Sequence, residues 1–283
     1  MQYVNSPKYR KTIRMTKRNV ALDTAKIIAR VEDGVGWLTF NSPERRNAVS
    51  LEMWRGMADA CAAFEADPEV RVVVMHGAGG KSFVAGADIS EFETQRANAE
   101  QKKHYGEISA RGQAGLANLS KPLIAMIQGF CIGGGLAIAL NADLRFATPG
   151  SRFGIPAAKL GLGYDYAGLA TLARLVGPST ARDILFSARF LEADEALRVG
   201  LINFVIDEAE LETRVREYAG RVAANAPLTV HAAKAAMNVF ERYSIDPQAA
   251  TIKALVDRCF DSEDYKEGRR AFMEKRPPRF TGR

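Results

Sequence analysis

The sequence predicts an α/β fold in which strands and helices alternate in a core and helices alone follow. Short apolar runs of strand length, such as residues 71–76 and 123–127, are separated by segments with helical spacing of apolar side chains. The last third of the chain has an almost entirely helical pattern. We therefore expect a core over residues 25–205, a helical region over residues 206–283, and a disordered basic extension over residues 1–24.

The first expected element is a β-hairpin. Residues 26–31 and 36–40 are rich in β-branched and aromatic side chains, and they flank the tripeptide Glu32-Asp33-Gly34. An Asp-Gly pair accepts the positive φ angles of a tight hairpin turn, so we expect the two runs to pair antiparallel.

A helix is expected to follow the hairpin, with Ser50 as its N-cap. Serine favours this position because its hydroxyl accepts a hydrogen bond from an amide of the first helical turn. Apolar side chains then recur at helical spacing, which predicts a buried face made of Leu51, Trp54, Met57, Cys61 and Phe64.

Three more strands are expected in the core, over residues 71–76, 123–127 and 144–147. Three glycines at residues 133–135 separate the second of these strands from a helix predicted over residues 136–140. Such a cluster lets the backbone approach a ligand closely and leaves amides unpaired at the helix start. Unpaired amides suit a developing oxyanion, and a tight strand-to-helix turn explains the glycines equally well.

The last third contains one short strand among helices. A helix over residues 193–198 is expected to end at Gly200, and a strand over residues 201–206 to follow it. Longer amphipathic helices are then expected over residues 208–224, 228–243 and 247–260.

The net charge of +6 is supplied by one segment, which contains Lys8, Arg10, Lys11, Arg14, Lys17 and Arg18. A basic folded surface for nucleic acid is therefore not expected. No apolar run approaches the roughly 18 residues that span a bilayer, so no membrane partner is expected. We expect a cytoplasmic protein, with a mitochondrial presequence as the alternative interpretation of the basic segment.

The few cysteines and histidines indicate neither a metal site nor a histidine base. Three of each occur, without metal-ligand spacing, and we expect mostly buried free thiols and no metal. His76 ends an apolar strand and His231 lies in an amphipathic helix, so both are interpreted as structural. His104, in a polar segment, is the one histidine kept as an outside candidate for a site.

Two common enzyme classes are excluded by their motifs. The glycine-rich run that ends in Lys81 and Ser82 resembles a phosphate-binding loop, but Met75 occupies the position of its first glycine. No G-x-S-x-G sequence occurs, so a nucleophile elbow of the serine hydrolases is also absent from the sequence.

Several segments together resemble the crotonase family, also called the enoyl-CoA hydratase/isomerase family. They are FNSPERRNAVS (residues 40–50), SFVAGADI (82–89), PLIAMIQG (122–129) with the glycines at 133–135, FGIP (153–156), SEDYKEG (262–268) and FMEKR (272–276). The resemblance implies a spiral core of ββα units and a helical C-terminal region that forms homotrimers, often paired into hexamers. It also implies an acyl-coenzyme A substrate and no separate cofactor, because coenzyme A is part of the substrate.

The resemblance also assigns roles to residues around the glycines. The backbone amides of Ala87 and Gly134 would form an oxyanion hole for the thioester carbonyl. The substrate and its coenzyme A portion would be bound by Ala85, Gly86, Asp88, Ile89, Ser90 and Gly133.

The chain departs from the family at both positions where a hydratase carries a catalytic glutamate. Those positions hold Ala137, two residues after the glycines, and Ala157, directly after the proline of FGIP. Alanine carries no titratable group, so hydration by a pair of glutamates is not expected. The chain is thus a divergent member by resemblance.

Asp165 is the candidate acid or base, and Tyr164 is a candidate proton donor or substrate partner. Asp165 is an acid in an apolar, glycine-rich loop, and burial beside an acyl chain would raise its pKa toward neutrality. Its alternative role is to cap the helix that follows it, and the alternative role of Tyr164 is packing. The expected reaction is an isomerisation, hydrolysis, decarboxylation or atypical hydration, and the alternative is a coenzyme A-binding protein without turnover.

Overall fold

Two β-sheets form the core of the structure, a computed structural model that describes residues 17–88, 91, 99–160, 166–242, 258, 261–274, 276 and 278–283. The larger sheet has seven strands in the order β1 (Lys17–Val20), β2 (Ile27–Glu32), β3 (Val35–Phe40), β4 (Val72–Gly77), β6 (Leu123–Ile127), β8 (Leu144–Ala147) and β11 (Phe204–Val205). The smaller sheet has four strands in the order β10 (Leu191–Glu192), β9 (Arg152–Gly154), β7 (Phe130–Ile132) and β5 (Ser82–Val84).

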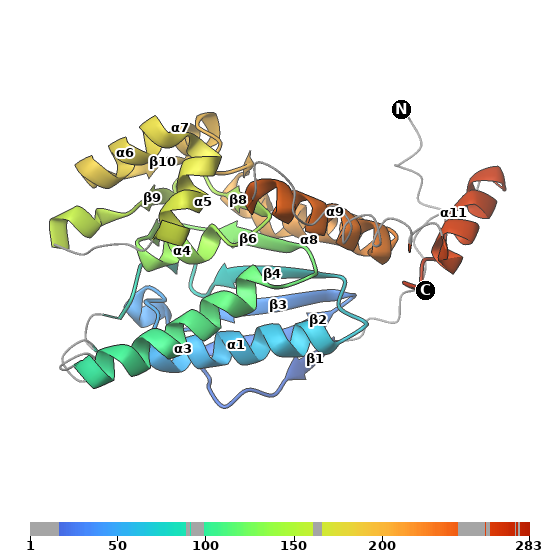
Figure 1. Ribbon diagram of the computed structural model, residues 1–283, viewed down its shortest axis with the longest axis horizontal. Helices are drawn as coiled ribbons and strands as arrows, with labels where there is room; N and C mark the ends of the chain where they lie inside the picture. The colour runs from blue at the N-terminus through green and yellow to red at the C-terminus, as the bar shows by residue number, and fades with distance from the viewer. Residues whose placement is uncertain are drawn as a thin grey trace.

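Helices surround the two sheets and dominate the last third of the described chain (Figure 1). They are α1 (Leu51–Ala66), α3 (Ala99–Ala117), α4 (Gly134–Ala139), α5 (Tyr166–Val176), α6 (Pro178–Ser187), α7 (Ala193–Arg198), α8 (Glu208–Ala224), α9 (Pro227–Arg242), α11 (Glu263–Met273) and the short 3₁₀ helices η2 (Pro43–Arg45) and η4 (Pro156–Leu160). The predicted α/β core and helical C-terminal region are confirmed. The helix predicted over residues 247–260 lies outside the described residues, apart from residue 258.

The hairpin at the start of the core has the predicted turn. Strands β2 and β3 pair antiparallel, with Glu32 opposite Val35. Asp33 and Gly34 have φ angles of 53° and 80°, the left-handed values that an Asp-Gly turn permits.

Strand β1 corrects the predicted start of the core. Lys17 to Val20 pair antiparallel with β2 at the edge of the larger sheet. The disordered extension predicted over residues 1–24 is therefore wrong for residues 17–20. This strand was not predicted, because an edge strand with exposed Lys17, Arg18 and Asn19 lacks the alternation of apolar and polar residues that indicates a strand.

The larger sheet is parallel from β3 through β4, β6 and β8 to β11. Strand β11 has only two residues, although residues 201–206 were expected to be extended. Leu201 is bonded elsewhere, because its carbonyl accepts from Arg145 Nε at 2.7 Å and its amide donates to the Ala196 carbonyl at 2.8 Å. The buried Arg145 side chain thus ties the end of α7 to β8.

Helix α1 packs on one face of the larger sheet and begins as predicted. The Ser50 hydroxyl accepts from the Met53 amide at 3.3 Å. The predicted apolar face is buried, and α3 lies against α1, with Trp54 Nε1 donating to the Tyr105 hydroxyl at 3.2 Å.

Helix α8 covers the opposite face. Its buried residues Leu211, Val215 and Ala219 pack against Trp37, Val72, Val74, Ile124 and Phe146 of the strands. Strand β4 is buried on both faces, which is why its sequence is a continuous apolar run rather than an alternation.

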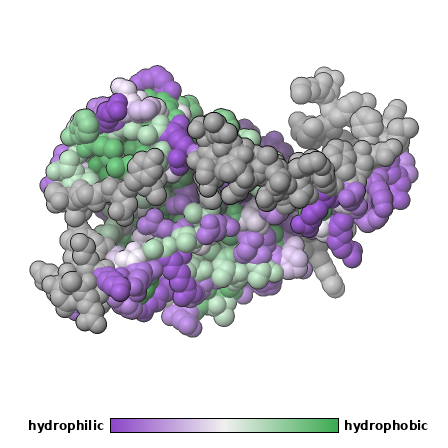
Figure 2. All heavy atoms as spheres, in the orientation of Figure 1, coloured by the Kyte–Doolittle hydropathy of each residue, from purple (hydrophilic) through white to green (hydrophobic). Residues whose placement is uncertain are grey.

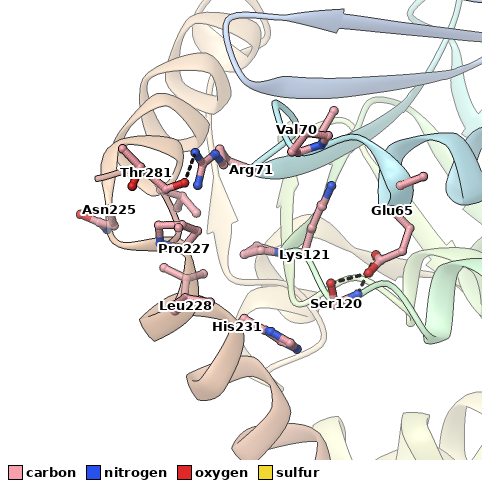
Figure 3. A pocket seen from close by; sticks show the side chains of 16 residues that line it. Glu65, Val70, Arg71, Ser120, Lys121, Asn225, Pro227, Leu228, His231 and Thr281 are labelled. Atoms are coloured by element: carbon pink, nitrogen blue, oxygen red, sulfur yellow. Dashed lines mark hydrogen bonds between the residues drawn. The ribbon is translucent and has the colours of Figure 1, made fainter. Parts of the chain in front are cut away.

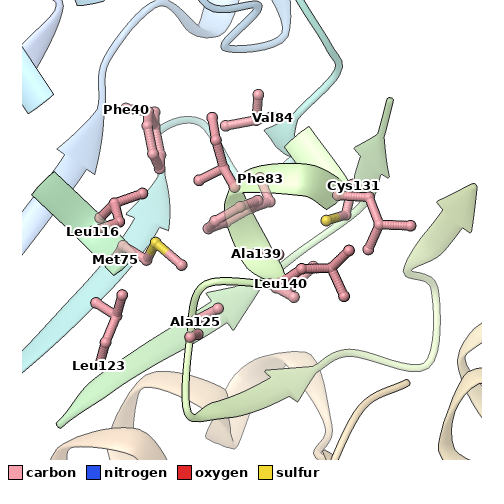
Figure 4. Packing of buried hydrophobic residues seen from close by; sticks show 14 of the residues in the cluster. Phe40, Met75, Phe83, Val84, Leu116, Leu123, Ala125, Cys131, Ala139 and Leu140 are labelled. Carbon is pink, nitrogen blue, oxygen red and sulfur yellow. The ribbon is translucent and has the colours of Figure 1, made fainter. Parts of the chain in front are cut away.

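The smaller sheet packs against the larger one through aromatic and aliphatic side chains (Figure 4). The Phe40 and Phe83 rings meet edge to face with centroids 5.4 Å apart. Both rings are fully buried, so β5 and the loop that follows it are held firmly against β3. In the part of the chain that the structure describes, no helix is long and apolar enough to cross a membrane.

Candidate active site at the glycine turn

The turn between β7 and α4 requires glycine at two of its three positions. Gly133 has a φ of 56° and a ψ of −117° as the N-cap of α4, and its amide donates to the Gly154 carbonyl at 2.8 Å. A Cβ on Gly135 would lie 1.9 Å from the Val84 carbonyl oxygen. The turn is therefore built for close approach of the β5 backbone.

Gly134 differs from its two neighbours because neither φ nor packing demands glycine there. The nearest atom to a Cβ at this position would be the Ala87 amide nitrogen, at 3.5 Å, which is an ordinary contact distance. Gly134 therefore lies directly beside the Ala87 amide, with room for a methyl group in ordinary contact.

The direction of the Ala87 amide follows from its pairing. The Val49 amide donates to the Gly86 carbonyl at 2.8 Å, and the Asp88 amide donates to the Val49 carbonyl at 3.0 Å. In such a parallel bridge, the residue between the two bonded ones directs its own N–H and C=O away from the partner strand. The Ala87 N–H therefore faces away from Val49.

Both amides lack a hydrogen-bond acceptor within the described residues. Gly134 is the first residue of α4, where the helix has no carbonyl to offer its N–H. Both residues are also partly exposed. Two backbone donors without a described acceptor thus belong to residues that lie beside each other, an arrangement that can bind one anionic or carbonyl oxygen.

The side chains nearest this turn carry no free acid in the described part of the chain. Ala137 lies in the first turn of α4, with its amide bonded to the Gly133 carbonyl at 3.0 Å, and Ala157 is buried in η4. Asp88 is paired with Arg45 at 3.0 Å. The Asp88 carboxylate is thus an ion-pair partner.

Four of the predicted site residues, Tyr164, Asp165, Ile89 and Ser90, lie outside the described residues. Helix α5 begins at Tyr166, directly after Asp165. Both interpretations of Asp165, as acid or base and as helix cap, therefore stay open.

None of the three histidines belongs to the turn, since they lie on β4, α3 and α9. His76 ends β4, where its Nε2 lies 2.9 Å from the Thr39 hydroxyl and its ring meets Trp37 edge to face. Burial lowers the pKa of His76 to about 4, which keeps the ring neutral. His104 is exposed on α3. The structural interpretation of His76 is confirmed.

The two described cysteines are free and buried, as predicted. Burial raises the pKa of the Cys61 thiol to about 12, so it is not a nucleophile at neutral pH. Within the described ranges, no three metal-ligating side chains gather closely enough to hold an ion.

A cavity of about 330 Å³ lies at the other end of the parallel strands, between α1, α9 and the C-terminal residues (Figure 3). Four of its polar side chains already serve the fold. Glu65 accepts from the Ser120 amide and hydroxyl, Lys121 Nζ donates to the Asp67 carbonyl at 2.6 Å, and Arg71 reaches the Thr281 carbonyl. We do not assign the reaction to this cavity.

Asn47 is a residue of this region whose role the sequence did not reveal. It lies in the loop before α1, is fully buried, and has a φ of 56°. The only signal in the sequence was an asparagine at the end of the polar run SPERRN. A polar run also fits an exposed loop, so the burial of Asn47 could not be predicted.

Comparisons with known proteins agree with this geometry. A family model described as Enoyl-CoA hydratase/isomerase matches residues 30–283. A short-chain-enoyl-CoA hydratase of Clostridium acetobutylicum is 37% identical over 255 residues, which cover 90% of this chain and 97% of the relative. A carnitinyl-CoA dehydratase of Proteus mirabilis is 35% identical, with 84% and 92% covered.

Solved structures show the same fold. The structure of an enoyl-CoA hydratase/carnithine racemase from Magnetospirillum magneticum superposes with a TM-score of 0.85 and 38% identity, covering 92% of this chain and 97% of that one. An enoyl-CoA hydratase/isomerase family protein from Hyphomonas neptunium gives 0.86 and 38%, with 91% and 98% covered.

Proposed function

The chain belongs to the enoyl-CoA hydratase/isomerase family, and from this premise we propose that it binds an acyl-coenzyme A thioester and stabilises an enolate on its carbonyl oxygen. The Ala87 and Gly134 amides would donate to that oxygen. The observation that carries the proposal is the position of these two amides on neighbouring, partly exposed residues, with no acceptor among the described residues.

This arrangement can lower the barrier of several reactions. Removing a proton from the α-carbon, or adding a nucleophile at the β-carbon, moves negative charge onto the thioester oxygen. Donors about 3 Å from that oxygen stabilise the charge without reorganising, and each contributes roughly 3 kcal/mol to the transition state. Because the donors are backbone groups held by β5 and α4, they are preorganised.

The coenzyme A portion would extend from the turn along residues 85–90. Ala85, Gly86, Asp88, Ile89, Ser90 and Gly133 are the proposed contacts. The backbone of residues 85–88 is extended beside residues 46–49, and Arg45 lies at its exposed edge, paired with Asp88. Coenzyme A enters as part of the substrate, so the proposal includes no separate cofactor.

Proton transfer would be carried out by Asp165, with Tyr164 as its partner or as a donor to the substrate. The support is that Ala137 and Ala157 stand where two glutamates would otherwise act, and neither can hold a proton. Relatives named hydratases and dehydratases make hydration a reaction to test, along with isomerisation, hydrolysis and decarboxylation. A hydration by this chain would have to proceed without that pair.

The test is a panel of acyl-coenzyme A thioesters assayed with the wild-type chain and with Asp165→Asn and Tyr164→Phe. We expect turnover of at least one thioester and a loss of about 100-fold or more in Asp165→Asn. Asp59→Asn on α1, whose carboxylate pairs only with Arg111 in the described structure, is the matched control. Binding without any turnover would support the alternative, a non-catalytic coenzyme A-binding homologue.

We also propose that the chain forms a homotrimer or hexamer. Met237 and Phe240 on α9 are 58% and 77% exposed, and they border a cavity of about 1010 Å³ beside α5 and α8. Phe186 on α6 is 77% exposed, in a region where apolar side chains gather on the surface (Figure 2). Two different apolar surfaces suit head-to-tail contacts that close into a ring. Sedimentation should give a trimeric or hexameric mass, and Phe240→Ser should lower it.

A further inference from the structure

We propose that Asn47 positions the Ala87 amide, acting through the backbone of residues 85–88 without touching the ligand. The inference rests on the proposed function, because it concerns one of the two oxygen donors. It adds a residue that the family resemblance did not assign.

The Asn47 side chain joins three backbone segments. Its Oδ1 accepts from the Ser42 amide at 2.9 Å. Its Nδ2 donates to the Ala78 carbonyl at 3.0 Å and to the Ser82 carbonyl at 2.8 Å. One fully buried amide therefore connects the loop before α1 to the end of β4 and to the first residue of β5.

The loop that Asn47 holds forms backbone hydrogen bonds with residues 85–88. The Arg46 carbonyl accepts from the Ala85 amide at 3.1 Å, and the Val49 backbone bonds to the residues on both sides of Ala87. These bonds determine where the Ala87 N–H points. A shift of the loop would therefore rotate this amide relative to Gly134.

Only an asparagine meets every demand at this position. An amide offers one acceptor and two donor hydrogens, whereas a carboxylate would present oxygen to two carbonyl oxygens. Asparagine also adopts the left-handed φ of 56° more readily than other side chains do. A Cβ on Gly77 would lie 2.7 Å from Asn47 Nδ2, so the absence of a side chain at the end of β4 leaves room for the Asn47 amide.

Two variants separate the side chain from the backbone conformation. Asn47→Gly keeps the left-handed φ accessible and removes the three hydrogen bonds, while Asn47→Asp keeps the shape and replaces two of them with repulsion between its carboxylate and the two carbonyl oxygens. The probe is 4-(dimethylamino)cinnamoyl-coenzyme A, whose absorption band moves to longer wavelength when its carbonyl is polarised. Val215→Ala, on the buried face of α8, is the control for lost stability alone.

We expect the wild type and Val215→Ala to shift the absorption band fully. Both Asn47 variants should give less than about half of that shift while binding free coenzyme A within about threefold of wild type. If Asn47→Asp does not fold, Asn47→Gly carries the test.

The inference is overturned if folded Asn47 variants keep the full shift, or if they lose the shift and coenzyme A binding together. A wild-type chain that binds the probe without any shift would instead overturn the proposed function, and this inference with it. The two failures are therefore distinguishable.

Discussion

The glycine turn and the sheet face under α8 use their polar groups in opposite ways. At the turn, the groups of interest are the backbone amides of Ala87 and Gly134, which have no hydrogen-bond acceptor in the described structure. Under α8, charged side chains pair and stack. Arg216 lies 4.3 Å from the centre of the Trp37 ring and bonds to Glu212 at 2.8 Å.

The difference teaches where function can be recognised in this chain. The α8 face has charged residues and a neutral histidine, yet their partners are other residues of the fold. Among the described residues, the turn has almost no polar side chains, yet it leaves backbone donors available for a ligand. Four changes test this contrast.

The largest effect is expected for Gly135→Ala. The new Cβ would lie 1.9 Å from the Val84 carbonyl oxygen, and both are backbone-anchored, so β5 and α4 must separate. We expect a loss of about 3 kcal/mol or more in the free energy of unfolding, measured by urea denaturation, and a loss of thioester binding. Unchanged stability would contradict the close packing of the turn.

Gly134→Ala should remove activity while leaving the fold intact. The added methyl group would meet nothing closer than the Ala87 nitrogen at 3.5 Å, so it fits, but it fills the space proposed for the oxygen. We expect turnover of an active thioester to fall about 100- to 1000-fold with an almost unchanged melting temperature.

Gly220→Ala on α8 is the matched control, because nothing lies within 4 Å of its Cβ. It should raise stability by about 1 kcal/mol through helix propensity and leave turnover unchanged. A Gly134→Ala variant as active as this control would remove the turn from the mechanism.

On the α8 face, the expected effect is on stability and depends on pH. Burial lowers the pKa of His76 to about 4 from 6.5; a backbone hydrogen bond with Gly77 opposes it most, and the charges of Arg30, Glu212 and Arg216 have smaller effects. Between these values the unfolded chain binds the proton and the folded chain does not, so stability falls as pH falls.

The His76 contribution should reach about 2 kcal/mol between pH 7 and pH 5. Urea midpoints measured at both pH values, for wild type and for His76→Gln, check the prediction. The variant should lose most of the slope, and an equal slope in both proteins would assign the pH dependence to other groups.

The sequence predicted the fold well where a local pattern had one structural meaning. The Asp33-Gly34 turn, the Ser50 cap and the buried runs of β4, β6 and β8 lie where they were expected. Strand β1 could not be predicted, because it is extended through its pairing with the edge of β2. Its own residues carry no local pattern that indicates a strand.

The site was predictable in part. The glycines indicated free amides, but only the pairing of residues 46–49 with residues 85–88 brings the Ala87 N–H to Gly134. No local pattern encodes such a long-range contact, and Asn47 was missed for the same reason. The roles of Asp165 and Tyr164 stay predictions, since these residues lie outside the described chain.

The smallest effect is expected for Ser50→Ala, which lies next to Val49 in the site region. The Ser50 hydroxyl serves α1 by accepting from the Met53 amide, and it makes no described contact with residues 85–88. Losing this cap should lower the free energy of unfolding by about 1 kcal/mol, with turnover within about twofold of wild type. A much larger loss of turnover would mean that the start of α1, and not only the Asn47 loop, orients the Ala87 amide.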